Sequence, residues 1–143
     1  MKHFTLETDK DGIALITFDS PGRSMNVLSG DVIVEIGEIV EKITNDEAIK
    51  GAVFTSGKAA FCAGADLEEM GGHLASVQTL MKKDPEAAKK QLFEKVYKLN
   101  ETFRAMETCG KPVAAAINGL ALGGGLNLVW PVMLVFSPVI ILN

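Results

Sequence analysis

Hydrophobic residues recur every second position in some stretches of the chain and every third or fourth in others, which predicts alternating strands and helices. Apolar positions on both sides of Asp9–Gly12 predict a β-hairpin with Asp-Gly at its turn. One apolar stripe over roughly 31–44 predicts an amphipathic helix, capped by Ser29 or Asp31. The short apolar run 50–55 predicts a buried strand.

The second half of the chain continues this alternation. A long helix is expected over roughly 85–108, because Asp84 is a good N-cap and Gly110 suits the end. Gly71-Gly72 is expected to interrupt the shorter helical segment that precedes the long helix. One stripe of the long helix is expected to be core: Leu92, Val96, Leu99, Phe103 and Met106. The resulting order of hairpin, helix, strand, helix, helix, strand and helix favours an α/β class.

Composition describes an ordinary globular domain. The 143 residues carry 48% hydrophobic residues, 22% charged residues and a net charge of −4, with no basic patch, so we expect no nucleic-acid partner. The two cysteines and two histidines have no metal-ligand spacing, so no metal site is expected. The N-terminus lacks the apolar segment of a signal peptide, and free thiols suit a reducing cytoplasm, which is the predicted location.

Two glycine- and alanine-rich turns carry the candidate chemistry. Residues 61–66 lead from small residues into a helix-forming segment, and 113–126 pass from a buried strand through Asn118-Gly119 to the triplet Gly123–Gly125. Glycine lets backbone N–H groups approach a ligand, and N–H groups at a helix start are unpaired and hold anions. Close packing of a helix on a strand is the alternative explanation. Neither a dinucleotide fingerprint nor a P-loop is present with correct spacing.

These two turns, Phe61–Met70 and Ala115–Leu126, together resemble the enoyl-CoA hydratase/isomerase (crotonase) family. The loop Pro21–Leu28 resembles the early CoA-side loop of that family, so the resemblance covers residues 1–126 in the family's order. The long helix is similar to that of the hydratase part of multifunctional fatty-acid oxidation alpha subunits. The resemblance implies a crotonase-like ββα spiral that binds acyl-CoA.

The resemblance also implies roles for individual residues. The N–H groups of Ala63 and Gly124 match the family's oxyanion hole, which stabilises the enolate of a thioester. Residues 63–66, which are Ala63, Gly64, Ala65 and Asp66, are expected to lie along the CoA moiety. Arg23 and Lys58 are candidates for binding CoA phosphates. No separate cofactor is expected, because coenzyme A is part of the substrate.

The chain departs from the family pattern after the glycine triplet. Family hydratases carry a glutamate where this chain has Asn127, and a second glutamate lies beyond the end of this sequence. Asn127 can orient a water molecule but cannot accept its proton, so little or no hydratase activity is expected. The family forms trimer-based homo-oligomers or multifunctional complexes that use later helices, so a C-terminally truncated spiral is expected to assemble and fold poorly.

Residues 127–143 form an apolar tail, and no charged residue occurs from Pro112 to Asn143. Back-translation in a shifted frame permits Glu-Leu at 127–128, which leads to the hypothesis that a one-base shift near Leu126 produced an out-of-frame tail. Two alternatives remain: a non-catalytic acyl-CoA-binding module, and a C-terminal membrane anchor. The anchor is disfavoured because two prolines interrupt the tail and no Lys or Arg flanks it closely. We therefore expect no membrane partner.

Overall fold

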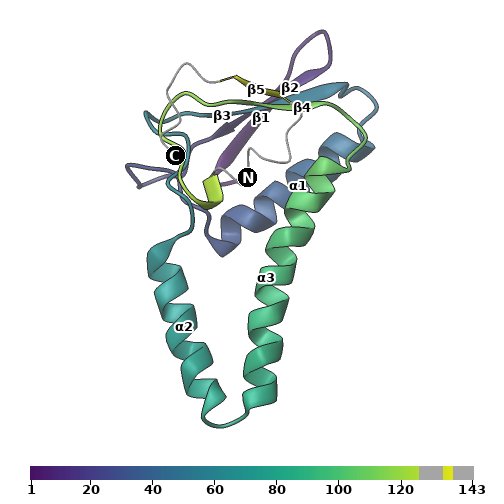
Figure 1. The fold of residues 1–143 in the computed structure, drawn as a ribbon. Coiled ribbons are helices and arrows are strands. Elements are labelled where there is room, and N and C mark those ends of the chain that lie inside the picture. Colours follow the sequence, from purple (N-terminus) through teal and green to yellow (C-terminus); the bar gives the residue numbers. More distant parts are fainter. Residues whose placement is uncertain (126–133, 137–143) are drawn as a thin grey trace.

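The computed structural model describes residues 1–125 and the backbone of 134–136, which form a five-stranded sheet in the order β1-β2-β3-β4-β5 (Figure 1). β1 (Phe4–Thr8) pairs antiparallel with β2 (Ile13–Phe18), which confirms the predicted hairpin. β3 (Gly51–Ser56), β4 (Val113–Ala116) and β5 (Leu134–Phe136) follow in parallel. The class is therefore α/β, as predicted.

The first helix, α1 (Gly30–Asn45), covers one face of the sheet (Figure 1). Ser29 is its N-cap, because the Ser29 hydroxyl accepts a hydrogen bond from the N–H of Val32 at 3.4 Å. The predicted apolar stripe is buried against the sheet: Val32, Ile33, Ile36, Ile39, Val40 and Ile43. These side chains and alternate residues of the strands form the core.

Lys111 fastens the far end of α1 to the strand that precedes the glycine triplet. Its Nζ donates to the carbonyl of Ile43 at 2.6 Å and to that of Asp46 at 2.7 Å. Carbonyls at a helix C-terminus have no partners within the helix, and a cation there is favoured by the helix dipole. This contact holds α1 next to β4.

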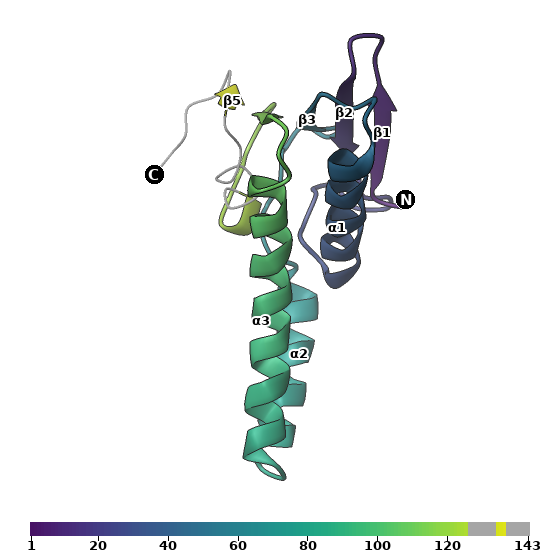
Figure 2. The ribbon, with the colours of Figure 1, turned by 90° about the vertical axis from the view of Figure 1, so that its right-hand side faces the viewer.

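Two further helices form an arm that projects away from the sheet (Figure 2). α2 (Leu67–Met81) runs through Gly71-Gly72, so the predicted interruption is wrong. Each glycine costs a helix only about 1 kcal/mol relative to alanine. Capping by Asp66 and packing of α2 against α3, with Val77 of α2 buried, offset that cost.

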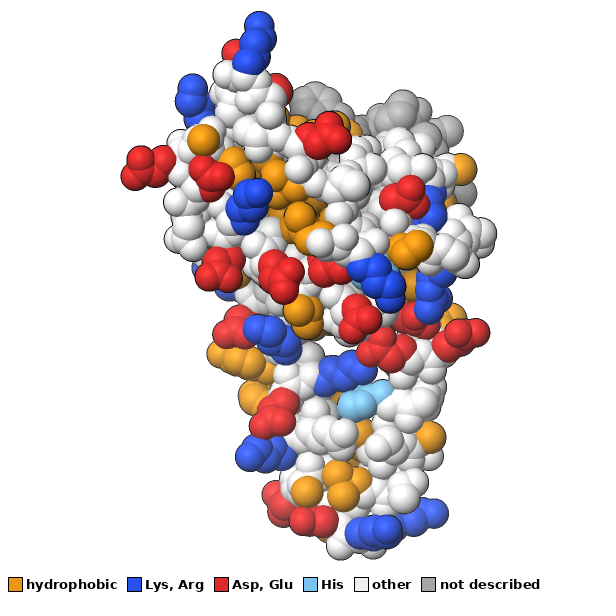
Figure 3. Space-filling view, turned by 180° about the vertical axis from the view of Figure 1, so that it is seen from behind, with side chains coloured by type: hydrophobic (Ala, Val, Ile, Leu, Met, Phe, Trp, Pro, Cys, Tyr) orange, Lys and Arg blue, Asp and Glu red, His pale blue; other side chains and the backbone are white. Residues whose placement is uncertain are grey.

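α3 (Pro85–Glu107) has the predicted N-cap, Asp84, but only half of its apolar stripe is core. Phe103 and Met106 are buried, whereas Leu92 and Val96 are 42% and 50% exposed. The prediction that the whole stripe is core is wrong, because the first half of α3 extends beyond the sheet and lies beside α2. Hydrophobic side chains therefore lie among charged ones on the surface of the arm (Figure 3).

No helix in the described part of the chain has both the length and the apolarity needed to cross a membrane. Asn127, the helix expected after the glycine triplet and most of the apolar tail lie outside the described residues. The frameshift hypothesis, the tail anchor and the role of Asn127 therefore stay predictions.

Candidate functional site

The two glycine- and alanine-rich turns lie side by side, joined by backbone hydrogen bonds. The N–H groups of Phe61 and Cys62 both donate to the carbonyl of Leu120, at 2.9 and 3.1 Å. The N–H of Leu122 donates back to the carbonyl of Cys62 at 2.9 Å. Residues 61–66, which we call the first loop, and 119–125, the second loop, are thus aligned in parallel, with a bridge between Cys62 and Ala121.

The loops approach so closely at Gly64 that only glycine fits there. Gly64 has a φ of +94°, and a Cβ built there would lie 2.9 Å from the carbonyl oxygen of Leu122 and 3.4 Å from the nitrogen of Gly124. A Cβ built on Gly124 would lie 3.7 Å from the nitrogen of Ala65. Gly64 therefore serves close backbone packing, and that packing brings the nitrogens of Ala65 and Gly124 near each other.

A third loop, residues 20–28, holds the other side of the first loop. The N–H of Leu28 donates to the carbonyl of Gly64 at 2.8 Å, and the N–H of Asp66 donates to the carbonyl of Leu28 at 3.1 Å. The N–H of Ala63 donates to the carbonyl of Asn26 at 2.9 Å. The predicted role of Ala63 is therefore corrected: its N–H already has a partner and is not available to an oxyanion.

The N–H groups of Ala65 and Gly124 lie at the contact between the loops and have no backbone acceptor in the part of the chain that the structure describes. In an extended segment the N–H groups of residues 63 and 65 would point to the same side. The positive φ of Gly64 turns the backbone between them, so the N–H of Ala65 does not follow that of Ala63 to the 20–28 loop. Gly124 begins helical backbone, where the first N–H groups have no intrahelical partner. Sequence pattern alone does not separate Ala63 from Ala65, because both flank the same glycine.

Asn26 is a functional candidate that the sequence analysis did not single out. It is fully buried, and its Nδ2 donates to the carbonyl of Phe18 at 2.7 Å and to the hydroxyl of Ser56 at 2.9 Å. Asn26 Nδ2 also lies 3.3 Å from the carbonyl oxygen of Phe61. The Oδ1 of Asn26 accepts from the N–H of Ser20 at 3.0 Å. The only sequence signal for it is a polar residue inside the apolar run 25–28.

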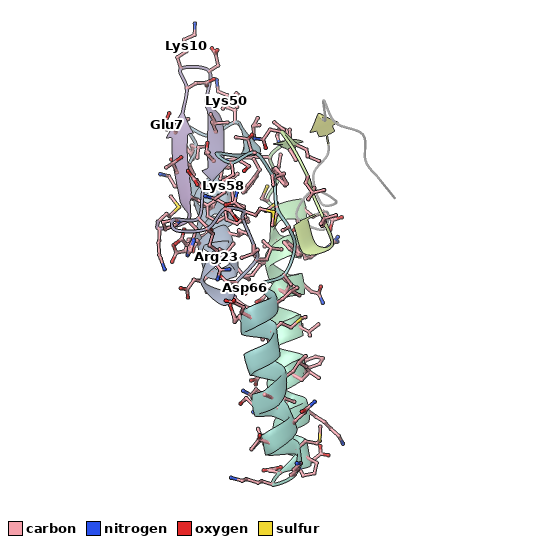
Figure 4. The ribbon with its side chains drawn as sticks, turned by 90° about the vertical axis from the view of Figure 1, so that its left-hand side faces the viewer. Glu7, Lys10, Arg23, Lys50, Lys58 and Asp66 are labelled. Atoms are coloured by element: carbon pink, nitrogen blue, oxygen red, sulfur yellow. The ribbon has the colours of Figure 1, made fainter. Side chains whose placement is uncertain are left out.

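The predicted CoA-binding side chains are engaged in ion pairs around these loops. A guanidinium nitrogen of Arg23 lies 2.6 Å from a carboxylate oxygen of Asp66, and Figure 4 shows the two side chains together at the start of α2. The Asp66 carboxylate also accepts the N–H groups of Glu68 and Glu69, so it caps α2 and is 5% exposed. The Nζ of Lys58 lies 2.6 Å from a carboxylate oxygen of Asp19.

A cavity of about 400 Å³ opens beside the Arg23–Asp66 pair, where the 20–28 loop meets the starts of α1 and α2. Gly30 and Glu69 lie on its wall, and the carboxylate of Glu69 accepts the N–H of Gly30 at 2.8 Å. That hydrogen bond, opposed by partial burial and aided by Lys95, lowers the pKa of Glu69. The Glu69 carboxylate is therefore ionised, and it accepts the N–H of the first residue of α1.

The site offers little support for a cysteine nucleophile or for a metal ion. Cys62 is fully buried, and this burial raises the pKa of its thiol, although a hydrogen bond with the backbone of Gly64 opposes the rise. The thiol is therefore protonated and a poor nucleophile at neutral pH. Within residues 1–125 no group of three or more His, Cys, Asp or Glu side chains could hold a metal ion.

Comparison with known proteins places this geometry in a family. A family model described as enoyl-CoA hydratase/isomerase matches residues 8–133. The chain is 38% identical over 130 residues to the fatty acid oxidation complex subunit alpha of Idiomarina loihiensis. It is 41% identical over 128 residues to the subunit of the same name from Shewanella frigidimarina. Both matches cover 89% of this chain, but the chain spans only 16% of the length of these curated relatives.

Solved structures share the fold. An enoyl-CoA hydratase from Bacillus anthracis superposes with a TM-score of 0.73 at 26% identity, covering 94% of this chain and 47% of that one. An enoyl-CoA hydratase from Shewanella pealeana superposes with a TM-score of 0.79 at 21% identity, covering 94% of this chain and 46% of that one. The predicted crotonase-like fold is thereby confirmed.

Proposed function

The chain belongs to the enoyl-CoA hydratase/isomerase family, and from this premise we propose that it binds acyl-CoA thioesters and holds the thioester oxygen between two backbone N–H groups. The donors are those of Ala65 and Gly124. One observation carries the proposal: both N–H groups lack a partner among the described residues, and close packing at Gly64 brings them together. Ala65 thus takes the role that the sequence analysis gave to Ala63.

Two N–H donors at one oxygen suit enolate chemistry. When a nucleophile adds at C3 of a 2-enoyl thioester, or a proton leaves C2, negative charge develops on the thioester oxygen. Fixed donors stabilise that charge without reorganising, and removing one such donor typically costs about 3–4 kcal/mol of transition-state stabilisation. The donors of this chain lie on loops that follow parallel strands. Hydrogen bonds hold the first loop on both sides and join the second loop to it, so the donors are fixed before a ligand arrives.

The curated relatives are named as subunits of a fatty acid oxidation complex, and we extend that chemistry to this chain. Its substrate class is then a 2-enoyl-CoA of fatty-acid oxidation. Arg23 supports binding of a CoA phosphate, because its side chain is 45% exposed and has N–H groups beyond the one bonded to Asp66. Lys58 is a weaker candidate, since its side chain is 14% exposed and paired with Asp19.

Addition of water requires a base as well as an oxyanion hole. Asn127 stands where family hydratases carry a glutamate, and an amide does not accept the proton of the attacking water. We therefore propose that this chain binds and polarises the thioester but hydrates it slowly. An acyl-CoA-binding module without catalysis is the second candidate function, and the same residue favours it.

The test compares an enoyl-CoA thioester with its thioether analogue, which lacks the carbonyl oxygen. Two neutral hydrogen bonds predict about a tenfold or greater preference for the thioester in titration calorimetry. Equal affinities would overturn the proposed oxyanion hole, and no binding of either ligand would overturn acyl-CoA binding itself. Loss of the ultraviolet absorbance of the conjugated enoyl thioester, monitored in parallel, separates slow hydration from none.

A further inference from the structure

Asn26 links three segments that must stay in register for the nitrogens of Ala65 and Gly124 to lie near each other. Resting on the proposed function, we infer that Asn26 is a positioning residue of the oxyanion hole. Its side chain bonds the ends of two neighbouring strands, through Phe18 of β2 and Ser56 of β3. Its main-chain carbonyl holds Ala63 of the first loop, two residues before the donor.

The first loop depends on this residue because the loop follows β3 without secondary structure of its own until α2 begins. Four of its backbone groups are held by the 20–28 loop: the carbonyls of Phe61 and Gly64 and the N–H groups of Ala63 and Asp66. Asn26 provides the partners of Phe61 and Ala63. The remaining contacts with the 20–28 loop, through Leu28, begin at Gly64. Loss of the Asn26 side chain removes the contact with Phe61 directly, and it shifts the main-chain carbonyl that holds Ala63 by freeing the 20–28 loop from Phe18 and Ser56.

Only a short amide can make this set of contacts. One side chain must accept from the N–H of Ser20 and donate to two carbonyls and a hydroxyl. Asn26 does so while it is 0% exposed, so water cannot replace any of these partners. Aspartate has the same shape but no donor, and its oxygens would face the carbonyls of Phe18 and Phe61. The expected result is a displaced loop, and displacement of a reacting group by about 1 Å is enough to reduce catalysis strongly.

The inference is tested with Asn26→Asp and Asn26→Ala in the full chain, with Lys111→Met as the matched control. Substitution of Lys111 also removes two part-buried hydrogen bonds, but these go to Ile43 and Asp46 at the end of α1 and not to either loop. We expect both Asn26 variants to lose about three- to tenfold of the thioester preference over the thioether, with thioether affinity retained. The absorption of bound 4-dimethylaminocinnamoyl-CoA should also shift less to the red, because its carbonyl is less polarised. Lys111→Met should keep both readouts.

The outcomes separate this inference from the proposed function. A wild-type chain without thioester preference overturns both. A wild-type chain with the preference, together with folded Asn26 variants that keep it, overturns the positioning role alone and leaves Asn26 as a stability residue. If neither variant folds, exchange of the Asn26 side-chain amide protons in the wild type decides. Linkage requires the thioester to slow that exchange more than the thioether does, and equal exchange rates overturn the inference.

Discussion

Replacing Gly64 with alanine tests whether the two loops touch as described. The residue has a φ of +94°, and the left-handed region costs an L residue about 1–2 kcal/mol. The added Cβ would also lie 2.9 Å from the Leu122 carbonyl oxygen, closer than real Cβ contacts, and overpacking of this kind costs about 1–3 kcal/mol. Together these terms predict a loss of about 2–5 kcal/mol in the free energy of unfolding.

Gly110→Ala is the matched control, because Gly110 has a φ of +78° and no atom within 4 Å of its Cβ position. It should lose only the backbone component, about 1–2 kcal/mol, in urea unfolding followed by circular dichroism. Gly64→Ala should additionally lose the thioester preference, since the nearest way to relieve the contact moves Leu122 and with it Gly124. Equal stability of the two variants, with the preference retained in both, would refute the described contact.

Three further predictions concern other parts of the fold. Burial raises the pKa of Glu35, but the backbone N–H groups of Lys2 and His3 outweigh it, so the pKa is lowered. The stabilising effect of this carboxylate is therefore present above the ordinary glutamate pKa and is lost as the pH falls through the lowered pKa. Glu35→Gln should flatten this acid limb of the stability curve, and an unchanged limb would contradict the assignment. Lys111→Met should lower the free energy of unfolding by about 2–3 kcal/mol, because the carbonyls of Ile43 and Asp46 lose a charged donor; a change below about 0.5 kcal/mol would count against this contact. Cys62 should react with a disulfide reagent only as fast as the chain opens, since its thiol is buried and its pKa raised, and rapid reaction in the folded protein would disagree.

Local signals predicted the regular elements well, because each is encoded by neighbouring residues. Asp84 and Pro85 fix the start of α3, and Asp9–Gly12 fixes the hairpin. The apolar stripe of α1 is buried along its whole length, since α1 lies flat on the sheet. The stripe of α3 is buried only in its second half, because how far a helix extends beyond a sheet depends on the packing of distant segments.

The candidate site shows the same division. The glycine-rich turns and their likeness to one family predicted the two loops, which the structure places side by side, and made Gly124 a candidate donor. The choice between Ala63 and Ala65 depended on which N–H the Asn26 carbonyl takes, and that partner lies 37 residues away in the chain. The position of Asp66 along CoA stays a prediction, whereas the contacts of its carboxylate with Arg23 and the first turn of α2 had no sequence signal. Such pairings arise from tertiary contacts, which spacing along one chain does not encode.

The amide resonances of the two loops test the central claim most directly. In a ¹⁵N–¹H spectrum of the full chain, saturation with an enoyl-CoA thioester should move the Ala65 and Gly124 amide protons downfield, and the thioether analogue should leave them in place. The Ala63 amide, already bonded to Asn26, should respond equally little to both ligands. A thioester-specific shift at Ala63 with none at Ala65 or Gly124 would contradict the account.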